Sequence, residues 1–273
     1  MGAMTNPNFP DQLRPDRAVI AISGEGALAF LHNLLTCDVV GLANGQAAYG
    51  ALLSPQGKIL HDVFVFNAGE QVLVDCALEQ RDALLQKLMM YKLRAKLTIT
   101  ARDDLEIAVG DKGYLDPRNV AMGHRFFAAK GASTTGEGYD AARIALGLAD
   151  SVQDIGSNNL FPHEANLDQF GGVNFTKGCY VGQEVVSRMQ HRGTARSRIL
   201  PVMGPGLVKN ASITSAHKTI GEILSTTGTT ALAIIRLDRL AEASAPLLSN
   251  ANTVKVQKPD WIKYQVTIPK AAQ

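Results

Sequence analysis

A short segment around position 180 carries the side chains best suited to chemistry. Residues 177–184 read Lys-Gly-Cys-Tyr-Val-Gly-Gln-Glu and follow Thr176, the expected N-cap of a helix. Apolar residues then recur at helical spacing, at Val181, Val185 and Met189. The start of a helix favours an anion, because it has free backbone N–H groups and the positive end of the helix dipole. Lys177 adds a cation two residues before Cys179, so we predict that Cys179 is a functional thiol.

A purely structural interpretation of the same segment has to be weighed, because a free cysteine is often only a small buried hydrophobic side chain. Gly182 lies inside the expected helix, where glycine costs about 1 kcal/mol relative to alanine. That cost indicates that a strand or a ligand approaches the backbone closely. Gln183 and Glu184 add an amide and a carboxylate in the same turn. Together with Gly178, these residues favour function over packing.

The composition is typical of a globular protein with a substantial core. Of the 273 residues, 46% are hydrophobic and 19% are charged. This length favours two or three compact units. The net charge of +2 is too small to indicate nucleic-acid or membrane binding, and no apolar stretch is long enough to span a bilayer. We therefore expect no membrane association and no direct nucleic-acid binding.

The cysteines indicate a reducing compartment. Their number is odd and they are scattered, at Cys37, Cys76 and Cys179, which argues against a disulfide framework. The N-terminus has no secretory signal pattern, and its first four residues are typical of a remnant of an expression tag. We predict a cytoplasmic protein.

The same residue types do not form a metal site. The cysteines lack Cys-x-x-Cys spacing, and His163, His191 and Glu164 match no known ligand pattern, so we predict no bound metal. One cysteine cannot hold an iron–sulfur cluster alone, because such clusters need several thiolate ligands. A cluster handled by this chain would be transient or shared with a partner.

Periodicity predicts an α+β fold with a β-rich end. Residues 19–100 give strand, helix, three strands, helix, strand, the order of a ferredoxin-like unit with one added strand. A second α+β unit spans about 104–196. From 197 onward, five short strands, the last of them Tyr264–Ile268, indicate a small antiparallel barrel. The predicted division is 1–16 (tag remnant and tail), 17–196 (units 17–103 and 104–196) and 197–273 (barrel).

The octapeptide resembles the signature of the YgfZ branch of the GcvT-like (aminomethyltransferase-like), folate-binding superfamily. It is highly specific, and shorter segments that are weak one by one resemble the same family. These are Leu34-Leu35-Thr36-Cys37-Asp38-Val39, Gln56-Gly57-Lys58-Ile59, Pro162-His163-Glu164-Ala165-Asn166-Leu167-Asp168, Gly171-Gly172-Val173 and Phe175. The resemblance runs from about residue 17 to the C-terminal barrel.

The resemblance implies two α+β halves and a barrel around a central channel that holds tetrahydrofolate or a derivative. It also implies a role in assembling or maintaining iron–sulfur enzymes, including one that modifies tRNA. By position, it assigns functional roles to Lys177, Gly178, Cys179, Gln183 and Glu184. Tyr139 aligns with a folate-contacting tryptophan, and its ring could stack on a pterin, although tyrosine at the start of a helix is also commonly part of a core.

Two departures weaken an aminomethyl-transfer interpretation. The aminomethyltransferases have a pterin-binding glutamate where this chain has Ala145, within Arg143-Ile144-Ala145-Leu146-Gly147. Their paired aspartates, one of them catalytic, become His61-Asp62. Asp62 retains a carboxylate that could orient a reactive nitrogen, so it stays a candidate catalytic residue.

A basic cluster follows the octapeptide: Arg188, His191, Arg192, Arg196 and Arg198. Arginine binds carboxylates in a bidentate manner, so one hypothesis is that Arg192 or a neighbour holds the glutamate tail of folate. The alternative is a solvated face at a domain junction.

The sequence therefore predicts a tetrahydrofolate-binding accessory factor for iron–sulfur enzymes, non-enzymatic or weakly catalytic, with client enzymes or assembly factors as partners. One alternative is a folate-dependent aminomethyl or C1 transferase. The other is an RNA-binding tRNA-modification factor, whose affinity should fall steeply with salt.

Overall fold

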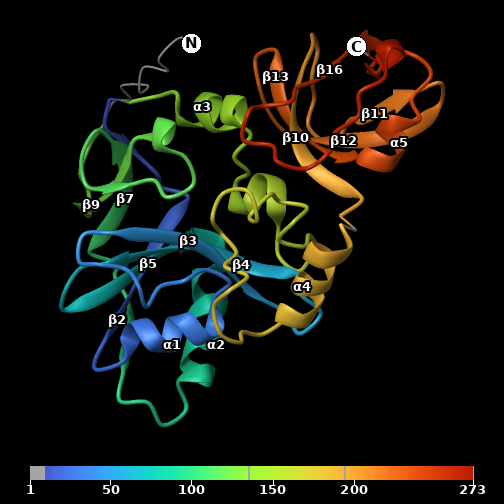
Figure 1. Cartoon of the computed structure of the whole chain (residues 1–273). Coiled ribbons are helices and arrows are strands. Elements are labelled where there is room, and N and C mark those ends of the chain that lie inside the picture. The colour runs from blue at the N-terminus through green and yellow to red at the C-terminus, as the bar shows by residue number, and fades with distance from the viewer. Residues whose placement is uncertain (1–9, 135, 194, 273) are drawn as a thin grey trace.

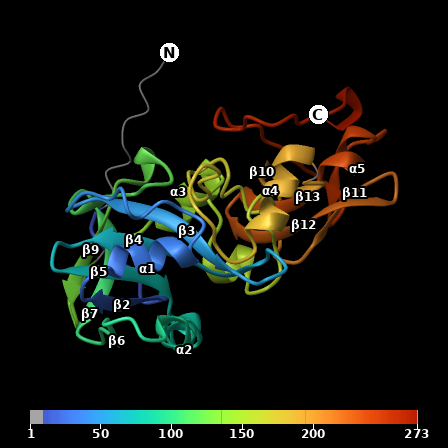
Figure 2. The same ribbon diagram turned by 60° about the horizontal axis from the view of Figure 1, so that its bottom comes forward.

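The structure of the chain is a computed structural model that describes residues 10–134, 136–193 and 195–272. Figure 1 shows an α+β N-terminal part beside a β-rich C-terminal part, and Figure 2 shows the same arrangement from a second direction. The predicted tag remnant lies outside the described residues. No helix within those residues has the length and apolar character needed to cross a membrane.

A five-stranded antiparallel sheet with two helices forms the first unit, in the predicted order of elements. Its spatial order is β3-β4-β5-β2-β6. The strands are β2 (Arg17–Ser23), β3 (Ala47–Leu53), β4 (Ile59–Asn67), β5 (Gln71–Ala77) and β6 (Thr98–Ala101). The helices are α1 (Ala27–Leu34), which follows β2, and α2 (Arg81–Lys92), which follows β5.

This sheet is buried on both faces, as strand β2 illustrates. Successive side chains of a strand point to opposite faces. Ile20 packs in one cluster with Leu31 of α1 and Leu84 of α2, whereas Val19 and Ala21 belong to a second cluster on the other face. The near-continuous apolar sequence of β2 follows from this double burial.

The second sheet is smaller and packs against the first. Its order is β1-β7-β9-β8, with β1 (Gln12–Leu13), β7 (Leu105–Gly110), β8 (Tyr114–Leu115) and β9 (His124–Ala129). The ring of Phe66 in β4 meets Tyr114 and Phe127 edge-on, with ring centroids 4.9 and 5.1 Å apart. Helix α3 (Tyr139–Leu146) follows β9, and short helical turns occupy Leu78–Gln80, Val120–Met122, Ser151–Ile155 and Lys270–Ala272.

The C-terminal part is a nearly closed antiparallel barrel. Seven strands follow the order β15-β14-β11-β12-β13-β10-β16: β10 (Ser197–Met203), β11 (Ser212–Ser215), β12 (Lys218–Thr227), β13 (Thr230–Arg236), β14 (Leu248–Ser249), β15 (Asn252–Thr253) and β16 (Lys255–Val256). Only Val254 separates the two edge strands β15 and β16, so the sheet must curl until its edges meet. Helix α5 (Leu237–Ala241) follows β13.

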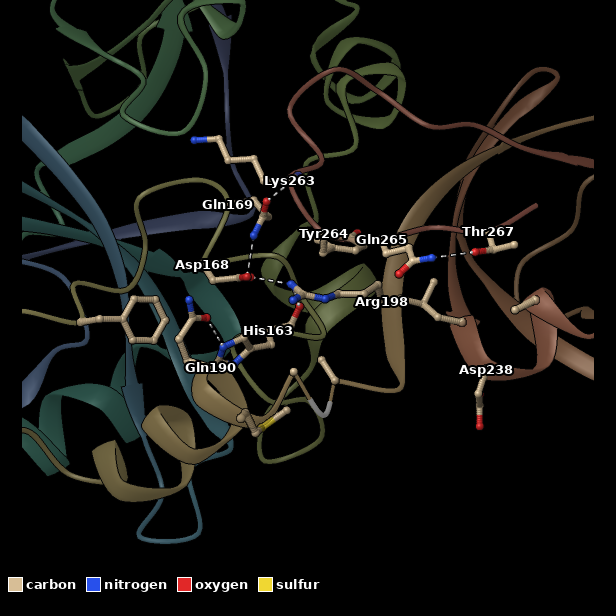
Figure 3. Close-up of a pocket in the computed structure, with 16 residues that line it drawn as sticks. His163, Asp168, Gln169, Gln190, Arg198, Asp238, Lys263, Tyr264, Gln265 and Thr267 are labelled. Atoms are coloured by element: carbon tan, nitrogen blue, oxygen red, sulfur yellow. Dashed lines mark hydrogen bonds and ion pairs between the residues drawn. The ribbon is translucent and has the colours of Figure 1, made fainter. Parts of the chain in front are cut away.

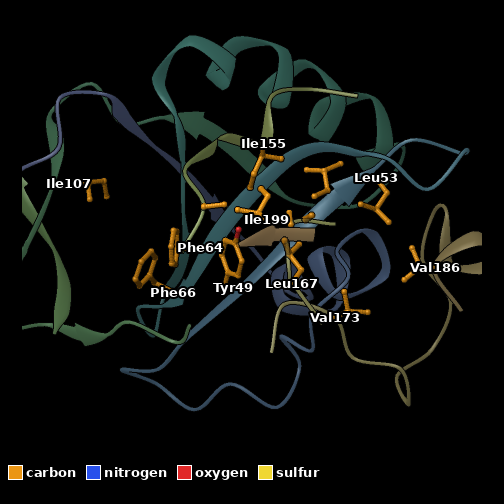
Figure 4. Packing of buried hydrophobic residues seen from close by; sticks show 14 of the residues in the cluster. Tyr49, Leu53, Phe64, Phe66, Ile107, Ile155, Leu167, Val173, Val186 and Ile199 are labelled. Atoms are coloured by element: carbon orange, nitrogen blue, oxygen red, sulfur yellow. The ribbon is translucent and has the colours of Figure 1, made fainter. Parts of the chain in front are cut away.

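One core connects the first sheet with the segments that carry the octapeptide. Figure 4 shows Leu167 of the loop before the octapeptide beside Tyr49 of β3, and Phe64 and Val173 belong to the same cluster. Val186 of α4 (Gln183–Arg192) and Ile199 of β10 belong to the same cluster. The loop, the helix and the barrel are therefore fixed to the first sheet by apolar burial.

Two sequence predictions about elements are wrong. Tyr264–Ile268 is not a strand. Val266 is buried in the core of the barrel, but the segment is not part of its sheet, and the Tyr264 hydroxyl group donates a hydrogen bond to Asn166 Oδ1 (3.0 Å). The helix expected directly after Thr176 begins at Gln183 instead. The Asn174 carboxamide oxygen accepts hydrogen bonds from the backbone N–H groups of Thr176 (2.8 Å) and Lys177 (2.9 Å), which forms a turn rather than a helix cap.

Candidate functional site

Cys179 is the exposed thiol of the chain. Its side chain lies in the loop before α4, and the sulfur forms no disulfide, whereas Cys37 and Cys76 are buried. Burial raises the pKa of each of these two thiols to about 12. A thiol must ionise to act as a nucleophile or a ligand, so Cys37 and Cys76 are unsuited to either role.

Lys177 anchors the loop on one side of Cys179. Its ammonium group donates hydrogen bonds to the backbone carbonyl oxygens of His32, Leu35 (2.5 Å) and Cys37 (3.1 Å), at the C-terminal end of α1. Burial lowers the pKa of this lysine. Among the described residues, no hydrogen bond joins its ammonium group to Cys179, so the cation neutralises carbonyl groups at a helix end.

Tyr180 anchors the loop on the other side. Its ring is buried in the core beneath the first sheet, and the Lys177 ammonium group lies 5.1 Å from the ring centroid. Gly178 and Cys179 stay exposed between these two anchors, and a Cβ added at Gly178 would have no atom within 4 Å. The thiol is thus presented on a short loop that is held at both ends.

Gly182 shows what approaches the backbone of the octapeptide. Its φ of +81° is a left-handed conformation, and a Cβ there would lie 2.6 Å from the carbonyl oxygen of Ser54 and 2.9 Å from the Cα of Gly57. The expected close approach is therefore made by the turn after β3. Because Gly182 precedes the first residue of α4, Cys179 lies in the loop before the helix and not in its first turn.

The remaining residues of the octapeptide and the basic cluster do not converge on one point. Glu184 pairs with Arg188 on the exposed surface of α4, and Gln183 is partly buried in the first turn of that helix. Arg192 is exposed in the last turn. Arg198 is buried and pairs with Asp168 (2.6 Å), so the five basic residues are not a single patch.

Tyr139 and Asp62 lie apart from the octapeptide, in a buried cluster of charges. The Tyr139 hydroxyl oxygen accepts hydrogen bonds from Arg118 (2.9 Å) and Arg125 (2.5 Å), and the Arg14 guanidinium lies 3.9 Å from its ring centroid. Burial alone would raise the pKa of this phenol, but the guanidinium groups of Arg118, Arg125 and Arg14 outweigh it and lower the pKa. Asp62 accepts a hydrogen bond from the Tyr49 hydroxyl group (3.0 Å).

Carboxylates balance these arginines. Asp75 accepts hydrogen bonds from Arg17 (2.5 Å) and from Arg125 (2.7 Å), and Asp116 pairs with Arg118 (2.9 Å). The cluster thus ties strand β5 of the first sheet to strand β9 of the second. Sequence reasoning missed it, although one signal was present: Asp75 is a charged residue inside an otherwise apolar strand.

A pterin does not fit this cluster in the present arrangement. The cavity between Asp62, Arg118 and Tyr139 has a volume of about 10 Å³, which is about the space of one water molecule. Arg14 covers one face of the Tyr139 ring, which was expected to stack on folate.

A much larger cavity lies elsewhere, with a volume of about 820 Å³. Figure 3 shows it between α4, the loop that carries His163 and Asp168, and the barrel. Arg198 forms part of its wall, where the guanidinium is held by Asp168 and by the carbonyl oxygen of His163 (both 2.6 Å) and lies 4.1 Å from the ring centroid of Tyr264. No cluster of three or more His, Cys, Asp or Glu residues that could hold a metal ion occurs in the described ranges.

Two segments of the chain match models of known protein families. Residues 17–106 match the model of the GCVT N-terminal domain, and residues 196–264 match the model of the CAF17 C-terminal beta-barrel domain. The fold is similar to that of the glycine cleavage system aminomethyltransferase T from Bartonella henselae, with a TM-score of 0.74, 14% identity and coverage of 95% of this chain and 88% of that chain. The predicted fold class, a GcvT-like α+β fold with a C-terminal barrel, is confirmed.

The curated relatives carry the name of one protein, the mitochondrial iron-sulfur cluster assembly factor IBA57 or its homolog. The protein from Pyricularia oryzae is 29% identical and covers 84% of this chain, which spans 72% of that relative. The protein from Coccidioides immitis is 32% identical and covers 68% of this chain, which spans 55% of that relative. The protein from Homo sapiens is 27% identical and covers 90% of this chain, which spans 83% of that relative. This chain thus spans only about half the length of some of these relatives. The predicted cytoplasmic location is wrong, because these relatives are named as mitochondrial proteins.

Proposed function

We propose that this protein is an accessory factor for iron–sulfur cluster assembly and that Cys179 is its functional thiol. The names of its relatives support the assembly role. The observation that carries the proposal is the position of Cys179, which is exposed on a loop held by Lys177 on one side and by buried Tyr180 on the other. The octapeptide supports the narrower kinship with YgfZ-like proteins.

In this proposal, the protein contributes one ligand to an iron–sulfur cluster, the sulfur of Cys179. Iron–sulfur clusters are held by several cysteine thiolates, and Cys179 supplies a single sulfur, so the remaining ligands come from a partner or a client enzyme. The cluster is cargo in this scheme. The open space beside Gly178 leaves room for a second protein to approach the sulfur, and the anchored loop reduces the entropy lost when that complex forms.

Complementation of cells that lack the protein tests this function. We expect cells that carry Cys179→Ala to have the same low iron–sulfur enzyme activity as cells that lack the protein. The activity of an enzyme without a cluster, measured in the same cells, is the reference. Cys76→Ala is the matched control, because it removes a buried free thiol and should restore activity. The purified Cys179→Ala protein should retain the melting temperature of the unchanged protein. Normal activity with Cys179→Ala would refute the role of this thiol.

Tetrahydrofolate stays a predicted ligand, and its position is a separate question. Binding beside Tyr139 and Asp62 requires Arg118 and Arg125 to move, because the space there is so small. The cavity beside Arg198 already has the volume of a small-molecule site.

Titration with 5-formyltetrahydrofolate distinguishes these positions. Ala241 lines the large cavity, so Ala241→Trp narrows that cavity. Asp62→Asn alters the buried cluster of charges around Tyr139. Loss of saturable binding in only one variant identifies the site, and absence of binding to the unchanged protein refutes the prediction. The roles expected for Gln183, Glu184 and Arg192 would be tested by the same titration.

The two alternatives also stay hypotheses. A C1 transferase would require turnover of an amine substrate that depends on Asp62. A factor that binds tRNA directly would require an affinity that falls steeply as salt rises. Cys179 has no necessary part in either scheme, so the complementation experiment separates both from the proposal.

A further inference from the structure

The C-terminal end of α2 and the turn after it form a surface that combines exposed apolar side chains with positive charge. Residues 83–101 contain four cations and no carboxylate, although the whole chain has a net charge of only +2. Met89, Met90 and Leu93 are 48%, 59% and 86% exposed. We call the segment 89–96 the basic tip.

The basic tip is held rigidly by the helix that carries it. Leu84 and Leu88 on the opposite side of α2 are buried against the first sheet, so the direction in which Met89 and Met90 point is fixed. Figure 1 shows α2 at the end of the molecule away from the barrel, and Figure 2 places it at the periphery as well. The tip is therefore distant from the barrel and free of neighbouring elements in both views.

The charges of the tip are uncompensated within the described part of the chain. Lys92, Arg94 and Lys96 form no ion pair there, unlike Arg81 and Arg102 just outside the tip, which pair with Asp103 (2.5 Å) and Asp104 (2.7 Å). Part of this charge stabilises the C-terminal end of α2 through the helix dipole. That effect accounts for Lys92 in the last turn, but it falls off within one turn and does not explain Arg94 and Lys96.

Leu93 is the least expected residue of the tip. It has a φ of +48°, a value rare for a branched apolar side chain, and it is also the most exposed large hydrophobic residue among those described. Glycine would be more stable at this position of the backbone. An apolar side chain at the apex of a turn is therefore unfavourable for the free protein on two counts.

The net charge of the whole chain led to the expectation of no membrane association, but it does not reflect the local charge of the tip. We propose that the basic tip binds the surface of an anionic phospholipid bilayer. The three cations match the negative headgroups, and the long side chains of lysine and arginine reach the headgroups while their stems stay in apolar surroundings. Met89, Met90 and Leu93 enter the boundary between headgroups and acyl chains, as apolar residues of interfacial segments do. An anionic bilayer offers both partners side by side, negative headgroups for the cations and the acyl boundary for the apolar side chains.

Co-sedimentation of the full chain with vesicles tests the proposal. We expect more binding to vesicles of mixed phosphatidylcholine and phosphatidylglycerol than to phosphatidylcholine alone, and a decline of that binding as salt rises, since screening weakens exposed charges. Lys92→Gln, Arg94→Gln and Lys96→Gln together should weaken binding by at least about tenfold. Val208→Ser with Lys209→Gln, an exposed apolar and basic pair of the barrel, should change nothing.

The variant Leu93→Gly separates lipid binding from folding. It should raise the melting temperature, because the strain at positive φ is relieved, and at the same time lower the affinity for anionic vesicles. Equal binding to both kinds of vesicle would overturn the proposal. Binding to soluble polyglutamate without binding to vesicles would also overturn it and would indicate an acidic protein as the partner.

Discussion

The ammonium group of Lys177 lies 3.1 Å from the carbonyl oxygen of Cys37, a residue 140 positions earlier in the chain. This contact joins two of the segments whose sequences resemble the same family, the end of α1 and the octapeptide. A lysine that seemed placed to activate the neighbouring thiol instead satisfies carbonyl groups at the end of a helix.

Lys177→Met should destabilise the protein by about 2 kcal/mol, because a methionine fills similar space but leaves the carbonyl oxygens of His32, Leu35 and Cys37 without their charged donor. Urea unfolding measures the loss. Lys209→Met, at an exposed position of the barrel, is the control and should have little effect. Equal stability of the two variants would mean that this cap is unimportant.

Alanine should destabilise the protein at one of the two glycines of the octapeptide and not at the other. Gly182→Ala places a Cβ 2.6 Å from the carbonyl oxygen of Ser54 at a positive φ, so we expect a loss of about 2 kcal/mol or more. Gly178→Ala meets open space and should preserve the melting temperature. Thermal unfolding of both variants is the measurement, and a stable Gly182→Ala protein would contradict the described contact.

Thiol labelling should separate the three cysteines. We expect N-ethylmaleimide to modify Cys179 at least about tenfold faster than Cys37 or Cys76 at neutral pH, because burial raises the pKa of the latter two to about 12 and limits access. Mass spectrometry of digested samples gives the rates. In denaturant the three rates should converge, and a slow Cys179 in the native protein would argue against the proposed thiol.

Stability should fall as the pH is lowered below about 7. Burial lowers the pKa of His61 and of His163 below the usual value near 6.5. The unfolded chain therefore takes up protons first, which favours unfolding between that value and the lower folded-state pKa. His163→Gln should reduce the dependence of the unfolding free energy on pH, whereas His217→Gln, at an exposed position, should leave it unchanged. If the unfolding free energy of the His163→Gln protein depended on pH as steeply as that of the unchanged protein, the role given to His163 would be contradicted.

Local sequence patterns were enough to predict the strands and helices of the first unit. They did not predict which side chains pair across the two sheets. Strand β2 and its neighbours were predictable because their apolar runs are bounded by turns. The position of Asp75 next to Arg125 was not, because these residues are 50 positions apart and belong to different sheets. Tyr264 shows the converse failure: its segment has a strand-like pattern and packs on the barrel core, but it does not join the sheet, and its hydroxyl group bonds to Asn166 instead.

The candidate site, like the fold, could be predicted from the sequence only in part. The special position of Cys179 follows from its segment, and its exposure agrees with a functional thiol. The start of α4 was misplaced, because the left-handed conformation of Gly182 depends on the turn at Gly57, more than a hundred residues away. Sequence periodicity carries no information about such a contact.

The shared core of Val186 and Ile199 has a mechanical consequence. Because β10 and α4 bury side chains in the same cluster as the first sheet, separating the barrel from the rest exposes the interior beneath the Cys179 loop. We expect the barrel and the loop to melt in a single cooperative transition. A force applied to the barrel by a bound protein would then reach the Cys179 loop through packed side chains.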